Sequence, residues 1–78
     1  MDREHILRAI RNRCERGHFS ATIPVLAHDL EVSADHLRLE MSVLFFQGYI
    51  EQHNHDGRVT YYTVTRKGDA ALSAGAAA

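Results

Sequence analysis

The chain has 78 residues, which is enough for one small domain and too short for two. Its 45% hydrophobic and 24% charged residues are typical of a globular protein, and its formal net charge of −1 argues mildly against a strongly anionic partner. With no apolar run near the roughly 20 residues of a membrane span, and one cysteine that allows no internal disulfide, we expect a soluble, cytoplasmic protein.

Three helices are predicted in the first part of the chain. Gly17 follows the first at the position usual just past a helix end, and a short extended piece then covers residues 18–22. Pro24 suits the first turn of the second helix, and Ser33 is a good N-cap for the third. From these signals and the apolar spacing, we expect helices at residues 2–16, 24–30 and 34–47.

After Gly48 the apolar pattern changes from helical to alternating, which indicates strands. Residues 49–53 form the first predicted strand, and residues 58–64, rich in β-branched and aromatic side chains, form the second. Between them stands an Asp-Gly pair at 56–57, a strong signal for a tight hairpin. The sequence therefore predicts a β-hairpin over about residues 49–64.

A last short helix is predicted after Thr65, whose side chain can cap it. The end of the chain has no large side chain to anchor it, so we expect a domain over residues 1–73 and a disordered tail over residues 74–78. Helices followed by a hairpin place the domain in the α+β class.

Two stretches in this order of elements resemble the winged helix-turn-helix domain. Residues 23–33 are similar to its first helix and turn, with a Leu-Ala pair, a Leu, and then a Val-Ser that leads into the recognition helix. Residues 61–68 resemble the segment after the wing in MarR-type and PadR-type regulators. One departure is Glu31, which stands where the family often has a glycine in the turn.

The resemblance implies a three-helix bundle with a two- or three-stranded antiparallel β-wing, and a DNA-binding transcriptional regulator that works as a homodimer. In the family the third helix enters the major groove, and the wing meets the minor groove or the backbone. Carried over to this sequence, the residues expected to contact DNA are Ala34, Asp35, His36, Arg38, Ser42, His55 and Arg58.

Some charged segments of the chain favour DNA binding, and the third helix opposes it. Residues 3–16 hold five Arg against two Glu, and the wing region adds further cations, so two basic patches are available for phosphate contact. The third helix, however, carries Asp35 and Glu40 against one Arg, which a phosphate field disfavours. We therefore expect modest affinity for each monomer and a need for dimerisation.

A second apolar stripe on the third helix leaves an alternative open. Leu39, Val43 and Phe46 recur at i, i+4 and i+7, nearly opposite the predicted core stripe. The stripe either packs partly under the wing or forms a contact with a second copy or another protein. The second case would favour a winged-helix protein–protein interaction module that does not bind DNA.

Metal binding and catalysis find little support. His53 and His55 alternate at the end of the first predicted strand and, with Asp56 or His36, could hold zinc or nickel. A solvated hairpin tip is the favoured interpretation. We expect no cofactor, no metal and no catalytic residue, and an inert, buried thiol at Cys14. On the second strand we expect Tyr61 to point outward and Tyr62 inward.

Overall fold

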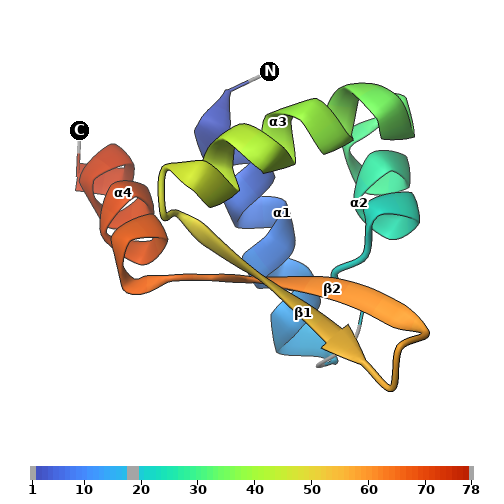
Figure 1. Cartoon of the computed structure of the whole chain (residues 1–78). Helices are drawn as coiled ribbons and strands as arrows, with labels where there is room; N and C mark the ends of the chain where they lie inside the picture. Colours follow the sequence, from blue (N-terminus) through green and yellow to red (C-terminus); the bar gives the residue numbers. More distant parts are fainter. Residues whose placement is uncertain (1, 18–19, 78) are drawn as a thin grey trace.

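The computed structural model describes residues 2–17 and 20–77, the last three of these by their backbone alone. Helix α1 lies at the centre and contacts α2, β2 and α4 (Figure 1). The expected α+β winged helix-turn-helix fold is confirmed. The elements follow in the order α1 (Arg3–Arg16), α2 (Ile23–Leu30), α3 (Ala34–Phe46), β1 (Ile50–His55), β2 (Val59–Val64) and α4 (Arg66–Ala77).

One hydrophobic core holds these elements together. Helix α3 contributes to it with the predicted stripe of Leu37, Met41 and Leu44, each at most 3% exposed. Burial of each such side chain stabilises the fold by about 1.5–3 kcal/mol. Among the described residues, the buried apolar side chains are Ile6, Leu7, Ile10, Ala21, Ile23, Leu26, Ala27, Leu37, Met41, Leu44, Ile50 and Leu72.

The turn between α2 and α3 is built from local bonds. The Ser33 side chain accepts a hydrogen bond from the His36 N–H at 3.2 Å, which confirms the predicted N-cap. Glu31 ends α2 in the left-handed region, with φ 56° and ψ 45°. That conformation costs a residue with a side chain about 1–2 kcal/mol. The glycine that the family often has at this position would avoid much of the cost.

The predicted hairpin is confirmed with slightly different ends. The strands pair antiparallel from Ile50 opposite Val64 to His55 opposite Val59. Positive φ angles at Asp56 (55°) and Gly57 (69°), and a bond from the Arg58 N–H to the His55 carbonyl at 3.0 Å, form the turn. Because Arg58 belongs to the turn, β2 begins at Val59.

Among the described residues the sheet has two strands, and a bond from β2 joins it to the segment before α2. The Tyr62 N–H donates to the Ala21 carbonyl at 3.0 Å, so this part of the expected extended piece lies along β2. Residues 18–19 of that piece lie outside the described residues. This bond anchors the base of the hairpin to the helices.

Helix α4 packs closely on the start of the hairpin. The Thr65 hydroxyl accepts from the Gly68 N–H at 3.2 Å and donates to the Gly48 carbonyl at 2.6 Å, which confirms its capping role. Gly68 is buried against the Tyr49 carbonyl with no room for a Cβ atom. The helix runs to Ala77 and so is longer than expected, while a domain ending at residue 73 with a disordered tail over residues 74–78 stays a prediction.

Candidate functional site

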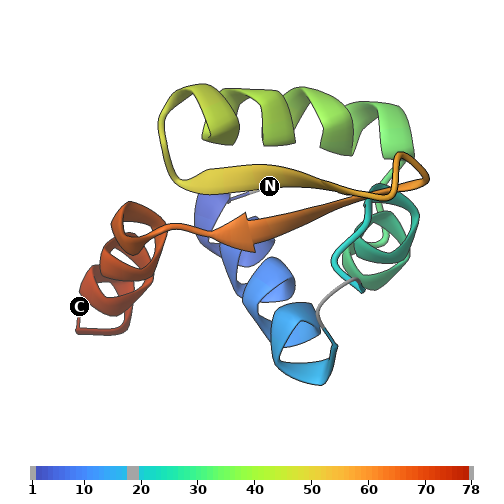
Figure 2. The ribbon, with the colours of Figure 1, turned by 60° about the horizontal axis from the view of Figure 1, so that its bottom comes forward.

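Helix α3 and the hairpin lie side by side on one face of the molecule, as Figure 2 shows. The hairpin tip lies at the end where α3 begins. Of the predicted contact residues on the helix, Asp35, His36, Arg38 and Ser42 are exposed. Ala34, expected to point outward, is half-buried and packs against the core, because it begins the helix directly above the turn.

The charged residues of α3 pair with one another. The Arg38 guanidinium donates to the Asp35 carboxylate at 3.0 Å, and His36 lies 3.9 Å from Glu40. The Arg38–Asp35 pair joins solvent-exposed side chains within one helix, and such a pair contributes only about 0.3–0.5 kcal/mol. Arg38 can therefore exchange Asp35 for another anionic partner at little cost.

The second apolar stripe of α3 faces solvent. Leu39 is 70% exposed, Val43 51% and Phe46 87%, so the stripe does not pack under the wing. Phe45, which is not part of the predicted stripe, is 46% exposed beside it. These four are the exposed large hydrophobic side chains among the described residues, and all of them lie on α3. We call them the α3 patch.

A groove of about 210 Å³ separates α3 from the hairpin. Its walls combine apolar and polar side chains. The hairpin contributes Gln52 and Tyr62, which stand opposite each other on the paired strands. Burial raises the pKa of Tyr62, and the nearby charge of Arg38 opposes this shift. The lining residues are Arg38, Met41, Ser42, Phe45, Phe46, Gln52 and Tyr62.

The hairpin tip presents Arg58 and His55 to solvent. Arg58 is exposed and has no carboxylate partner among the residues that the structure describes. His55 lies 3.3 Å from the carboxylate of Asp56. Arg58 is therefore the side chain of the tip that is available for contact with an external anion.

The predicted orientations of the two tyrosines on β2 are confirmed, and the outward one contacts His53. Tyr62 packs against the core, whereas Tyr61 stacks on His53 with ring centroids 5.0 Å apart. His53 also lies 2.9 Å from the Thr63 hydroxyl, so cross-strand contacts hold its ring. Within residues 2–17 and 20–77, no three metal-binding side chains are grouped closely enough to hold an ion.

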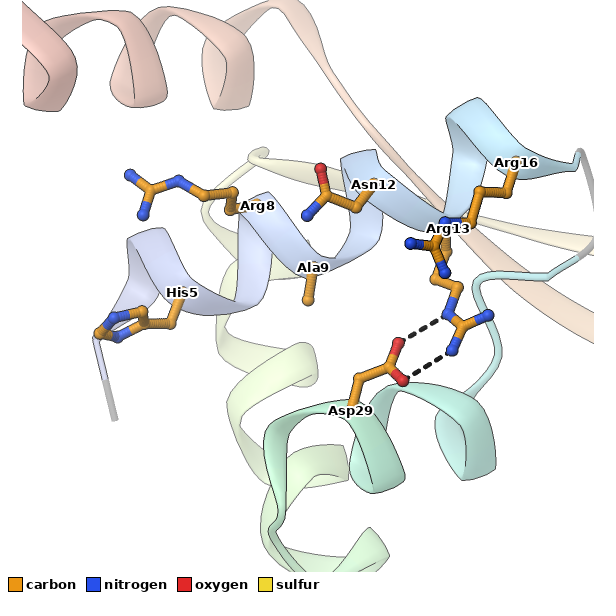
Figure 3. Close-up of a pocket in the computed structure, with 7 residues that line it drawn as sticks. All are labelled: His5, Arg8, Ala9, Asn12, Arg13, Arg16 and Asp29. Atoms are coloured by element: carbon orange, nitrogen blue, oxygen red, sulfur yellow. Dashed lines mark hydrogen bonds and ion pairs between the residues drawn. The ribbon is translucent and has the colours of Figure 1, made fainter.

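The arginines of α1 are less available than the sequence suggested. Two parallel bonds of 2.6 Å join the Arg13 guanidinium to the Asp29 carboxylate and tie α1 to α2 (Figure 3). Arg3 bonds the Tyr49 hydroxyl at 2.8 Å, and Arg11 lies 4.0 Å from Asp69. Three of the five arginines therefore have partners within the domain.

The two remaining arginines border a shallow basic hollow. Arg8 and Arg16 are exposed and line a hollow of about 350 Å³ over α1 and α2, and Figure 3 shows Arg8 extending away from Asp29. The hydrogen bonds from Arg13 hold the pKa of Asp29 below its usual value, and the charge of Arg16 adds to this. Arg8 and Arg16 remain candidates for contact with a phosphate.

Cys14 is half-buried and held in place. Its thiol donates to the Tyr62 carbonyl at 3.3 Å, and burial raises its pKa. A raised pKa reduces the thiolate fraction, on which reactivity depends. This agrees with the inert thiol predicted from the sequence.

The α2–turn–α3 unit followed by a hairpin defines a winged helix-turn-helix domain. No protein-family model matches the sequence, and a search of curated proteins finds no significant match. A solved structure from Ralstonia eutropha JMP134, described as a putative DNA-binding protein, superposes with a TM-score of 0.71 over 95% of each chain at 16% sequence identity. This likeness shows the fold, while the MarR or PadR type stays a prediction.

None of the helices, in the part of the chain that the structure describes, combines the length and apolar character that crossing a bilayer requires. The cytoplasmic location stays a prediction.

Proposed function

We propose that this protein binds double-stranded DNA as a transcriptional regulator, with α3 in the major groove and the hairpin tip against the backbone or minor groove. The observation that supports this is an exposed α3 beside an exposed hairpin, whose tip carries Arg58 with no carboxylate partner among the described residues. The fold neighbour described as a DNA-binding protein adds support. Asp35, His36, Ser42 and His55 are the further contact residues of the proposal.

Its affinity follows from the few cations that are available. Arg58, Arg8 and Arg16 have no carboxylate bond among the described residues, and Arg38 exchanges its partner at low cost. If these four arginines each neutralise one phosphate, log K falls with log salt concentration with a slope of about −3.6. That slope is shallow for a specific DNA-binding protein, so the expected affinity of one monomer is modest.

The test is a titration of fluorescent duplex DNA at low and moderate salt. Arg58→Ala should weaken binding and reduce the salt slope by about 1, because one phosphate contact is lost. Arg66→Ala is the matched control, since Arg66 is exposed on α4, away from the hairpin tip (Figure 1). Absence of binding at low salt, or equal effects of the two substitutions, would contradict the proposal.

A second candidate function is a protein–protein interaction module that uses Leu39, Val43 and Phe46. The observation that favours it is the exposure of the whole α3 patch on the surface that would otherwise read DNA. Apolar patches of this kind mark interaction surfaces. The partner that we propose first is a second copy of this chain, which would form a homodimer. Neither proposal includes a cofactor or a catalytic residue.

A further inference from the structure

The α3 patch contains both a protruding side chain and a recess that can receive one. Phe46 is 87% exposed at the C-terminal end of α3. The groove between α3 and the hairpin adjoins the patch, because Phe45 and Phe46 line one end of it, and Met41 and Tyr62 complete its apolar walls. A two-fold symmetric dimer needs a surface that is complementary to itself, and a protrusion beside a recess meets this requirement.

We propose that a second copy of this chain docks on the α3 patch with the two α3 helices antiparallel, so that each Phe46 enters the groove of the other copy, and that this dimer and DNA compete for the same face. The competition rests on the proposed DNA binding, whereas the dimer does not depend on it.

The spacing along α3 fits an antiparallel pair. With 3.6 residues per turn, Leu39, Val43 and Phe46 lie within about 60° of one another on the helix surface. If the two-fold axis passes between Ser42 and Val43, Leu39 of one copy stands opposite Phe46 of the other. Phe46 then lies over the end of the groove that Arg38 and Ser42 line.

The charges at the two ends of α3 are complementary in this arrangement. Asp35, with its side chain 96% exposed, marks the N-terminal end of the patch. At the C-terminal end, Lys67 donates to the Gln47 carbonyl at 2.7 Å and, with Arg3, lies over the Tyr49 ring. An antiparallel pair brings Asp35 of each copy, which exchanges its Arg38 partner at low cost, toward Lys67 and Arg3 of the other copy, whereas a parallel pair would place the two Asp35 side chains together.

The exposed area is enough for a weak dimer. An aromatic side chain buries about 150–250 Å² when it is enclosed, so Phe46 alone offers on the order of 170 Å². The four side chains of the α3 patch together offer roughly 450–500 Å² per copy, and weak interfaces bury up to about 600 Å² per partner. We therefore expect association that depends on protein concentration.

The consequence for DNA binding follows from the position of the patch. The second copy would cover the outward face of α3, including Ser42 and Asp35, which the proposed DNA complex needs. Monomers would then be the form that binds DNA, and the dimer a form from which DNA is excluded. This differs from the sequence-based expectation that dimerisation strengthens DNA binding.

The test measures the mass of the intact protein by light scattering over a roughly hundredfold range of concentration, with and without duplex DNA. We expect the mass to rise from monomer toward dimer, and DNA to return it to one protein per bound site. Phe46→Gln should weaken self-association about tenfold or more, because it removes the central aromatic group. Arg58→Gln, at the hairpin tip, should leave self-association unchanged and weaken DNA binding.

A cross-linking experiment tests the direction of the helices. Leu39→Cys and Phe46→Cys are each made in a Cys14→Ser background, and the two proteins are mixed and oxidised. The antiparallel pair predicts a mixed covalent dimer in preference to either symmetric one, and circular dichroism checks that each variant is folded. Preference for the symmetric dimers would overturn this geometry.

The possible failures are distinguishable. A wild-type protein that stays monomeric at every concentration, or a dimer that Phe46→Gln leaves intact, would overturn the dimer without affecting the proposed DNA binding. A dimer that binds DNA without dissociating would overturn the competition alone. A dimer that shows no DNA binding at low salt would overturn the competition together with the proposed function.

Discussion

The contact of α4 with the hairpin makes Gly68→Ala a sensitive test of the fold. Gly68 is buried, and an added Cβ atom would overlap the Tyr49 carbonyl oxygen and come within 2.5 Å of a Val64 methyl carbon. The carbonyl cannot easily retreat, because it also accepts the Thr65 N–H at 3.0 Å. Forcing extra volume into such a site costs about 1–3 kcal/mol.

The direction of the change in stability distinguishes a steric clash at Gly68 from the effect of helix propensity. In an open helix, replacing glycine by alanine stabilises by about 1 kcal/mol, so the absence of a clash would make the variant more stable. Because the overlap is with a carbonyl that cannot easily retreat, the clash outweighs the gain in propensity, and we expect the free energy of unfolding to fall by about 1–2 kcal/mol. Each kcal/mol lowers the melting temperature of a domain of this size by about 4–8 °C.

The assay is urea unfolding followed by circular dichroism, with Ser73→Ala as the matched control. Ser73 is exposed on the same helix, so its substitution should change stability by a few tenths of a kcal/mol in the favourable direction. A Gly68→Ala variant as stable as the wild type, or more stable, would refute the close packing of α4 on the hairpin.

Three further predictions concern other local features. Because Arg13 holds the pKa of Asp29 low, the pair stabilises the fold above the usual aspartate pKa, and this stabilisation is lost as the pH falls through the lowered pKa. The melting temperature of Asp29→Asn should therefore lie below that of the wild type at neutral pH and approach it in acid. A difference in melting temperature that does not change with pH would contradict this. Glu31→Gly should raise the free energy of unfolding by up to about 1 kcal/mol, since it relieves the left-handed strain at some cost in chain entropy, and a loss of stability in urea would argue against that strain. Burial and a raised pKa should make Cys14 react with a disulfide reagent far more slowly in the folded protein than in urea, and equal rates would show that the thiol is accessible.

The features that the sequence predicted correctly depend on neighbouring residues. The caps at Ser33 and Thr65 and the tight turn at residues 56–57 arise from side chains and backbone within a few positions of one another. The core stripe of α3 follows from helical period alone. Such signals are present in the order of the residues and do not require knowledge of the packing.

What the sequence left open depends on contacts between distant segments. Arg13 and Asp29 are 16 positions apart on different helices, so nothing local showed that this arginine is unavailable for DNA. The exposure of the Leu39 stripe depends on which side of α3 the hairpin packs against. The hairpin approaches α3 on the side of Arg38, where Tyr62 lines the groove, and leaves the Leu39 stripe uncovered. The pairing of Arg38 with Asp35 is different, because residues three apart on one helix are neighbours and helical spacing alone indicates such a contact.

One face of α3 packs in the core and the other is exposed to solvent, and this affects which substitutions the protein tolerates. Leu37, Met41 and Leu44 anchor the helix, whereas Leu39 and Phe46 make little contribution to the core. Substitutions on the outer face therefore leave folding nearly unaffected while they alter the surface offered to a ligand. A lineage of such domains can acquire new binding preferences one residue at a time without passing through unstable intermediates.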